Sequence, residues 1–247
     1  MKKPAIILVP GSWHTGVDYF SLTTRLQQAG YDVHALDMPS TSGSTSQDIW
    51  KDDVAYIRSI IVRLCDAAQE VVVVMHSRGG QVGGDAVENL GKSQRTEEGK
   101  SGGVIRMLYI CAFALAEGVT LFDATKDPPS WIHFYDERSM MMPMTVGKMF
   151  YSDCSADLVE KQAERLRPVP TGTMSDHKVE YAAWKHLPST YLICEQDNAL
   201  PMAAQEAMIS QPGAHFDVER CAASHSPFHS MPDFTAQVVR RAAGEQI

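Results

Sequence analysis

Residues 71–80 read VVVVMHSRGG, and this stretch decides the predicted fold. Four consecutive valines without polar alternation are typical of a parallel strand whose two faces are both covered by helices. A short turn with Ser77 at its tip follows, then a helical pattern, and Gly79 is the small residue expected two positions after the tip. This order of strand, turn and helix predicts a nucleophile elbow that presents Ser77 at the carboxyl edge of the sheet. A serine that only caps the helix is the alternative.

Apolar runs rich in β-branched residues recur on both sides of this stretch, and helix-length segments separate most of them. This alternation predicts an α/β fold on a mostly parallel sheet of about six strands, with helices on both faces. The expected strands are 5–9, 32–36, 71–75, 104–111, 190–194 and 215–218, and the expected helices are 17–29, 46–68 and 233–243. Residues 91–103, GKSQRTEEGKSGG, are polar and glycine-rich, so we expect a solvated loop there.

One connection is too long for a simple crossover, because about 80 residues lie between the fourth and fifth expected strands. We therefore expect residues 118–187 to form a cap over a core made of residues 1–117 and 188–247, with a helix at 155–166. Methionines are flexible apolar side chains that suit an adaptable pocket, and packing of the cap onto the core is their alternative role. The aromatic residues and methionines of the insert that are candidate substrate contacts are Trp131, Phe134, Met141 and Met144.

A serine hydroxyl needs a base to become nucleophilic, and the base needs an acid that holds its tautomer. His225 follows the last expected strand and can reach the elbow from the same edge of the sheet, and His229 is the nearest alternative. Asp197 follows the strand 190–194, and Glu195 is the alternative acid. The chain order of serine, aspartate and histidine is the order expected for this architecture.

Acyl transfer also requires backbone N–H groups directed at the developing oxyanion. One is the amide of Arg78, directly after the nucleophile. We expect the second to be the amide of Ser12, because Gly11 lets the backbone of that loop approach closely. The Arg78 side chain is expected to pair with a carboxylate of the cap or the surface, and contact with an anionic group of the substrate is the alternative. The residues near these positions that are candidate pocket residues are Trp13, His14 and His76.

Composition limits the partners of the chain. With 22 basic and 30 acidic residues, its net charge of −8 disfavours nucleic acid and anionic membranes and favours a small organic substrate. The five cysteines contain no CxxC pair, so we expect neither a disulfide framework nor a metal site, and the expected chemistry needs no cofactor. No apolar run approaches the roughly 18 residues of a membrane span. We expect a soluble, cytoplasmic protein, with a homodimer as a candidate assembly.

Several motifs support one family resemblance: PGSWH at 10–14, LDMPS at 36–40, MHSRGG at 75–80, CEQDNALP at 194–201 and SHSPF at 224–228. With them the chain resembles the α/β-hydrolase superfamily over nearly its whole length, and within it small hydrolases of the plant methylesterase and hydroxynitrile lyase type and their fungal and bacterial relatives. The resemblance implies Ser77 as nucleophile, Asp197 as acid and His225 as base. It also implies that the Ser12 and Arg78 amides form the oxyanion hole.

The sequence therefore predicts a serine hydrolase that cleaves a carboxylic ester or lactone of a small apolar substrate through an acyl-enzyme. One alternative is a lyase or cyclase of the same fold that acts on a biosynthetic, for example polyketide-like, intermediate. The other is a ligand receptor that retains the three residues. One departure from the family pattern concerns the elbow, because Met75 stands where a glycine is usual.

Overall fold

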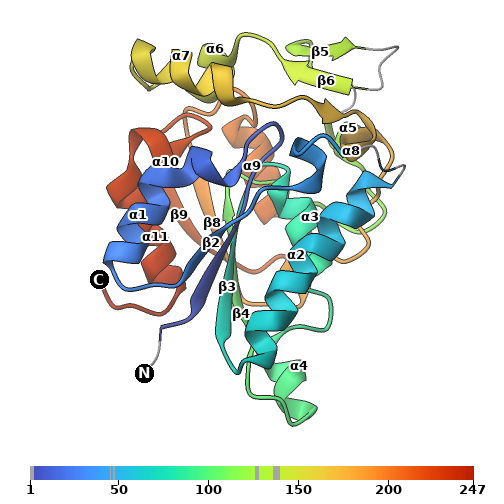
Figure 1. The fold of residues 1–247 in the computed structure, drawn as a ribbon, viewed down its shortest axis with the longest axis vertical. Coiled ribbons are helices and arrows are strands. Elements are labelled where there is room, and N and C mark those ends of the chain that lie inside the picture. Colours follow the sequence, from blue (N-terminus) through green and yellow to red (C-terminus); the bar gives the residue numbers. More distant parts are fainter. Residues whose placement is uncertain (1–2, 45, 47, 126–127, 136–139) are drawn as a thin grey trace.

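The centre of the molecule is a six-stranded sheet with the order β2-β1-β3-β4-β8-β9, in which every neighbouring pair is parallel (Figure 1). The computed structural model describes residues 3–44, 46, 48–125, 128–135 and 140–247. The strands are β1 (Ala5–Val9), β2 (Val33–Ala35), β3 (Glu70–His76), β4 (Gly103–Ile110), β8 (Ser189–Cys194) and β9 (Phe216–Cys221). This architecture confirms the predicted fold class, and each strand overlaps its expected range.

Helices cover both faces of the sheet (Figure 1). The α-helices of the core are α1 (Phe20–Gln28), α2 (Ile49–Asp66), α3 (Gly79–Ala86), α4 (Lys92–Glu97), α9 (Met202–Ile209), α10 (Pro227–Ser230) and α11 (Pro232–Ala242). The short 3-10 helices are η1 (Gly16–Tyr19), η2 (Pro39–Thr41) and η4 (Ala183–Lys185). No helix among the described residues is long and apolar enough to cross a membrane.

The valine run of β3 is apolar at every position because its side chains enter two separate cores. Val71 and Val73 pack in the cluster that includes residues of α2 and α3, whereas Val72 and Val74 pack with residues of α1 and α11. All four are fully buried, to within 1%. Burial on both faces thus explains why this strand lacks the polar alternation of a half-exposed one.

The expected loop at 91–103 is wrong, because part of it forms α4. Arg95 is only 4% exposed despite its charge. Its guanidinium donates to the Gly102 carbonyl at 2.8 Å and pairs with Asp66 at 2.6 Å. These two contacts tie the helix to the start of β4 and to the end of α2, and a polar composition alone does not reveal them.

The long insert between β4 and β8 contains its own small sheet, which is antiparallel and ordered β5-β6-β7. In Figure 1, α6, α7, β5 and β6 lie beyond the carboxyl ends of the central strands. Residues 182–184 and 187 pack in the main core, although they fall within the range expected for the cap. The elements of the insert are α5 (Leu121–Thr125), β5 (Ile132–Tyr135), β6 (Met140–Pro143), α6 (Val146–Phe150), α7 (Ala156–Arg165), β7 (Val169–Pro170) and α8 (Gly172–Ser175).

Candidate active site

Ser77 occupies a strained turn between β3 and α3. Its φ of 53° lies in the left-handed region, which residues other than glycine rarely adopt. The turn brings α3 against the end of β1, where a Cβ on Gly79 would lie 2.7 Å from the Val9 carbonyl oxygen. A real Cβ essentially never comes that close to another heavy atom. The close approach therefore requires glycine at position 79, and Ser77 is held at the carboxyl edge of the sheet.

Met75, the departure from the family pattern, is accommodated by a second glycine. Met75 is fully buried, and a Cβ on Gly83 would come within 2.8 Å of its sulfur. The missing side chain at position 83, on α3, thus creates the room that the larger residue on β3 needs. The larger side chain on β3 and the missing side chain on α3 therefore compensate for each other in the packing of the elbow.

The loops that follow β8 and β9 bring Asp197 and His225 together. His225 donates from Nδ1 to Asp197 Oδ2 at 2.7 Å, and both side chains are buried. The other carboxylate oxygen of Asp197 accepts the amides of Ala199 and Leu200, each at 2.8 Å. Three donors therefore fix the orientation of the carboxylate. Because Nδ1 makes the bond to Asp197, the other ring nitrogen of His225, Nε2, is not used in that bond.

The alternative residues lie in other surroundings. The Glu195 side chain is 41% exposed and lies 4.0 Å from Arg220. His229 packs against Tyr151 and Phe228 rather than against the carboxylate of Asp197. Burial lowers the pKa of His229 to about 4, so its ring is neutral near neutral pH. Of the two acids and two histidines considered, the structure pairs Asp197 with His225.

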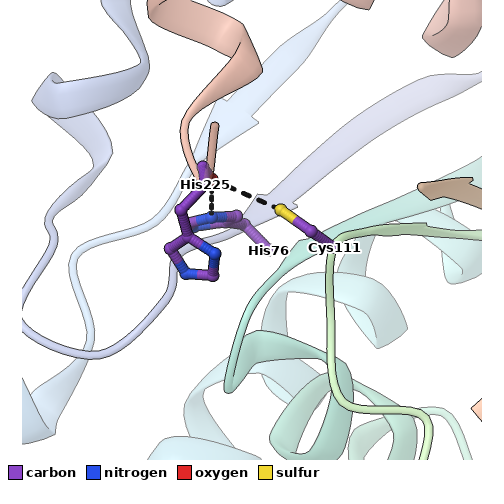
Figure 2. A group of neighbouring side chains, drawn as sticks. All are labelled: His76, Cys111 and His225. Carbon is purple, nitrogen blue, oxygen red and sulfur yellow. Dashed lines mark hydrogen bonds between the residues drawn. The ribbon is translucent and has the colours of Figure 1, made fainter. Parts of the chain in front are cut away.

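A buried histidine supports the backbone of His225. His76 Nε2 lies 2.8 Å and Cys111 Sγ 3.3 Å from the His225 carbonyl oxygen, and the dashed lines of Figure 2 mark both contacts. A carbonyl only accepts, so His76 Nε2 carries the proton, and Nδ1 must accept from the Tyr19 hydroxyl at 2.8 Å. That hydroxyl in turn accepts the Gly11 amide at 3.0 Å. The chain of bonds links the loop of the expected base to the loop after β1.

The same network lowers the tendency of this cluster to bind a metal. The donor atoms of His76, Cys111 and His225 lie within 4.8 Å of one another. However, burial raises the pKa of the Cys111 thiol to about 12. A thiol that stays protonated is a poor metal ligand. Both nitrogens of His76 are already hydrogen-bonded. The cluster is therefore explained as a packing and hydrogen-bonding layer.

The loop after β1 is held by a second buried histidine and by the insert. His14 donates from Nδ1 to the Ser12 carbonyl at 2.8 Å and accepts from the Tyr151 hydroxyl at 2.7 Å. Burial lowers the pKa of His14, which favours this neutral form. Trp13 adopts a φ of 67° and donates from Nε1 to the Met141 carbonyl at 3.1 Å. Residues of the insert thus fix the orientation of the Ser12 peptide.

The Arg78 side chain is turned away from the edge of the sheet into the core. Its Nη2 donates to Asp53 at 2.7 Å and to the Ser40 hydroxyl at 3.0 Å, and Asp53 also accepts the Ser40 amide at 2.9 Å. Arg78 and Asp53 are 1% and 0% exposed. The ion pair expected for Arg78 exists, but its partner is a buried carboxylate of α2 and not one of the cap or the surface.

A cavity opens beside the elbow, and both Ser77 and His225 line it. Of the other residues expected at the site, Ser12, Trp13, Arg78 and Trp131 also line it. His14 and His76 belong to the buried network described above. The residues that sequence reasoning missed are Phe113, Leu121, Thr125, Pro129, Ile132, Phe150, Met174, Ala199 and Leu200.

Three insert residues expected to contact substrate lie elsewhere. Met141 is fully buried in the apolar cluster of the insert, and Phe134 packs against that cluster. Met144 is 42% exposed and lines a separate surface hollow, which shares Trp131 with the cavity. Within β6, Met141 and Pro143 are buried while Met140 and Met142 are half-buried, because successive side chains of a strand point to opposite faces. Met144 follows the end of this strand.

Comparison with known proteins agrees with this geometry. A family model described as "Alpha/beta hydrolase family" matches residues 6–238. The alpha/beta hydrolase nvfD of Aspergillus novofumigatus is 35% identical over 251 residues, which cover 100% of this chain and 99% of that protein. A pyrethroid hydrolase from Sphingobium faniae shares the fold with a TM-score of 0.75 and 21% identity over 97% of each chain. Polyneuridine aldehyde esterase gives a TM-score of 0.77 at 17% identity, over 97% of this chain and 98% of that one. The chain therefore belongs to the alpha/beta hydrolase family.

Proposed function

We propose that this protein is a serine hydrolase that cleaves a carboxylic ester or lactone through an acyl-enzyme. One observation carries the proposal: Ser77 stands on a strained strand-to-helix turn and shares a cavity with His225, whose Nδ1 is bonded to the buried Asp197. With its proton on Nδ1, His225 has Nε2 available as a base toward a hydroxyl in that cavity. This is the arrangement that makes a serine nucleophilic.

In the proposed reaction, Ser77 Oγ attacks the carbonyl carbon while His225 Nε2 takes its proton. Asp197 stabilises the resulting imidazolium, and His225 then returns the proton to the departing alkoxide. A water molecule, deprotonated by the same imidazole, attacks the acyl-enzyme and frees the acid and Ser77. The backbone amides of Ser12 and Arg78 are proposed to bind the oxyanion, because both residues line the cavity beside the nucleophile.

The cavity supports an uncharged, apolar substrate. Its walls are mostly aromatic and aliphatic side chains. The guanidinium of Arg78 is paired with Asp53, and His225 is paired with Asp197, so neither offers an unpaired charge to a ligand. An ionised substrate would lose its hydration without a compensating partner. We infer that the insert, apart from residues 182–184 and 187 that pack in the main core, acts as the cap of this cavity, since Trp131 and Phe150 belong to its wall.

A Ser77→Ala variant tests the mechanism. Alanine keeps the backbone but removes the nucleophile, so kcat/KM for a short aryl ester should fall by about a thousandfold or more. Ser59→Ala, at an exposed position of α2, is the matched control and should behave as wild type. Retained turnover in Ser77→Ala would overturn the proposal.

Trapping separates hydrolysis from the two alternatives. A burst of leaving group equal to the enzyme concentration, with an acyl group on Ser77 detected by mass spectrometry, is expected for a hydrolase. A lyase or cyclase would turn over its substrate without an acyl-enzyme. A receptor would bind the ester without turnover.

A further inference from the structure

A second apolar groove lies beside the catalytic cavity. It lies between the segment that follows β4, α5 and α9. Phe113, Thr125 and Leu200 line both hollows, so the two share a wall and meet at these residues. The groove therefore adjoins the catalytic cavity across these three side chains.

The chemistry of the groove is apolar along its length. Leu115, Ala124 and Met208 form its walls together with the shared residues. Its polar members are Thr125 and Gln211. The Gln211 side-chain amide donates to the Ala114 carbonyl at 2.7 Å and to the Met208 carbonyl at 2.8 Å, and the Thr125 hydroxyl donates to the Leu121 carbonyl at 3.2 Å. None of the described residues that line the groove carries a charged side chain. A hydrocarbon fits this surface, and an ion does not.

Small residues keep the groove open. Ala204 and Ala207 face it from α9, and both are exposed. Larger side chains at these positions would fill it. Because both alanines are exposed, no tightly packed neighbour requires a small residue at these positions. The alanines thus leave an apolar surface in contact with water.

The floor of the groove is rigidly anchored. Gln205, fully buried on α9, accepts the Cys194 amide at 3.0 Å and donates to the Leu200 carbonyl at 2.8 Å. Its amide also donates to the Cys194 carbonyl at 3.0 Å. These bonds fix α9 to the end of β8, three residues before Asp197. The groove is therefore preformed, and a ligand does not have to order this helix.

We propose that the groove between α5 and α9 binds an uncharged hydrocarbon arm of the ester, on the acyl or the alcohol side, while the carbonyl lies at Ser77. This assignment rests on the proposed hydrolase function. Each methylene that moves from water into the groove should raise kcat/KM about fourfold, until the groove is full. The protein would thus select its substrate by the length and bulk of an apolar arm.

An Ala207→Phe variant tests the proposal with two ester series. In the first series the acyl group lengthens from acetate through butyrate and octanoate to dodecanoate on a fixed aryl alcohol. In the second series the alcohol lengthens on a fixed acetyl group. The wild type should show a rise of kcat/KM with chain length in at least one series, and Ala207→Phe should reduce the ratio of the long to the short ester at least tenfold.

Met202→Phe is the matched control, because it places the same ring on the same helix at another face. Met202 is 38% exposed, and its position, two residues before Ala204, turns it about 200° from the groove. It should keep the wild-type ratio, and unchanged melting temperatures would show that both variants fold. If kcat/KM did not change with chain length in either series, or changed equally in the two variants, the proposed role of the groove would be overturned. If the wild type cleaved none of the esters, the proposed hydrolase function itself would be overturned.

Discussion

Replacing Asp197 with asparagine should stop turnover while leaving the loop intact. Two amides, those of Ala199 and Leu200, demand an acceptor at 2.8 Å, so the asparagine oxygen must occupy the place of Oδ1. The side-chain NH₂ then faces His225 Nδ1, which can only accept from it. The imidazole is forced to carry its proton on Nε2, the nitrogen proposed to act as base. Base catalysis is lost because the tautomer is wrong.

The expected loss is about ten-thousandfold in kcat, as in other enzymes with a serine, histidine and acid triad. This corresponds to about 5 kcal/mol of transition-state stabilisation. The assay is hydrolysis of a short aryl ester, together with urea denaturation to show that Asp197→Asn folds. Asp197→Ala is the control for the loop. Unlike asparagine, alanine cannot accept the amides of Ala199 and Leu200, so this variant should be the less stable of the two. A kcat within tenfold of wild type in Asp197→Asn would refute the assigned tautomer and the role of the carboxylate.

Two further predictions concern buried charge and pH. Asp53→Ala leaves the guanidinium of Arg78 buried without its carboxylate. The free energy of unfolding measured in urea should therefore fall by about 3 to 5 kcal/mol. The double variant Asp53→Leu with Arg78→Met should regain most of that loss, because it removes both buried charges. Burial lowers the pKa of His229 to about 4, below its unfolded value of 6.5, so the unfolded state takes up a proton first as the pH falls. The stability that this group contributes above pH 6.5, about 3 kcal/mol, is then lost as the pH falls toward 4. In His229→Phe the free energy of unfolding should depend less on pH over this range. An equal slope of the unfolding free energy against pH in the variant and the wild type would contradict this.

The central fold could be predicted because its signals are local. The valine run of β3 shows burial on both faces, and the turn after it requires glycine at position 79. Ser77, Asp197 and His225 follow three different strands, and parallel strands end at one edge of the sheet. The sequence thus predicted both the fold and the meeting of Asp197 with His225.

The rest depends on contacts that no local pattern encodes. Phe113 and Leu200 could have been proposed for the cavity, because they follow β4 and β8 at the same edge as Asp197. Phe150 and Met174 could not, since their place depends on how the insert folds over the sheet. The partner of Arg78 was missed for a similar reason, because an aspartate of α2 has no sequence feature that marks it as buried.

The bonds between the insert and the loop after β1 make the two segments mutually dependent. The Tyr151 hydroxyl and the Met141 carbonyl hold that loop from one side, and the Arg167 amide donates to the Trp13 carbonyl at 2.9 Å. Transplanting the insert of a relative onto this core would therefore exchange more than the walls of the pocket. A chimera without a hydroxyl at position 151 would carry a loosened Ser12 peptide, however well its new side chains fitted the intended ligand.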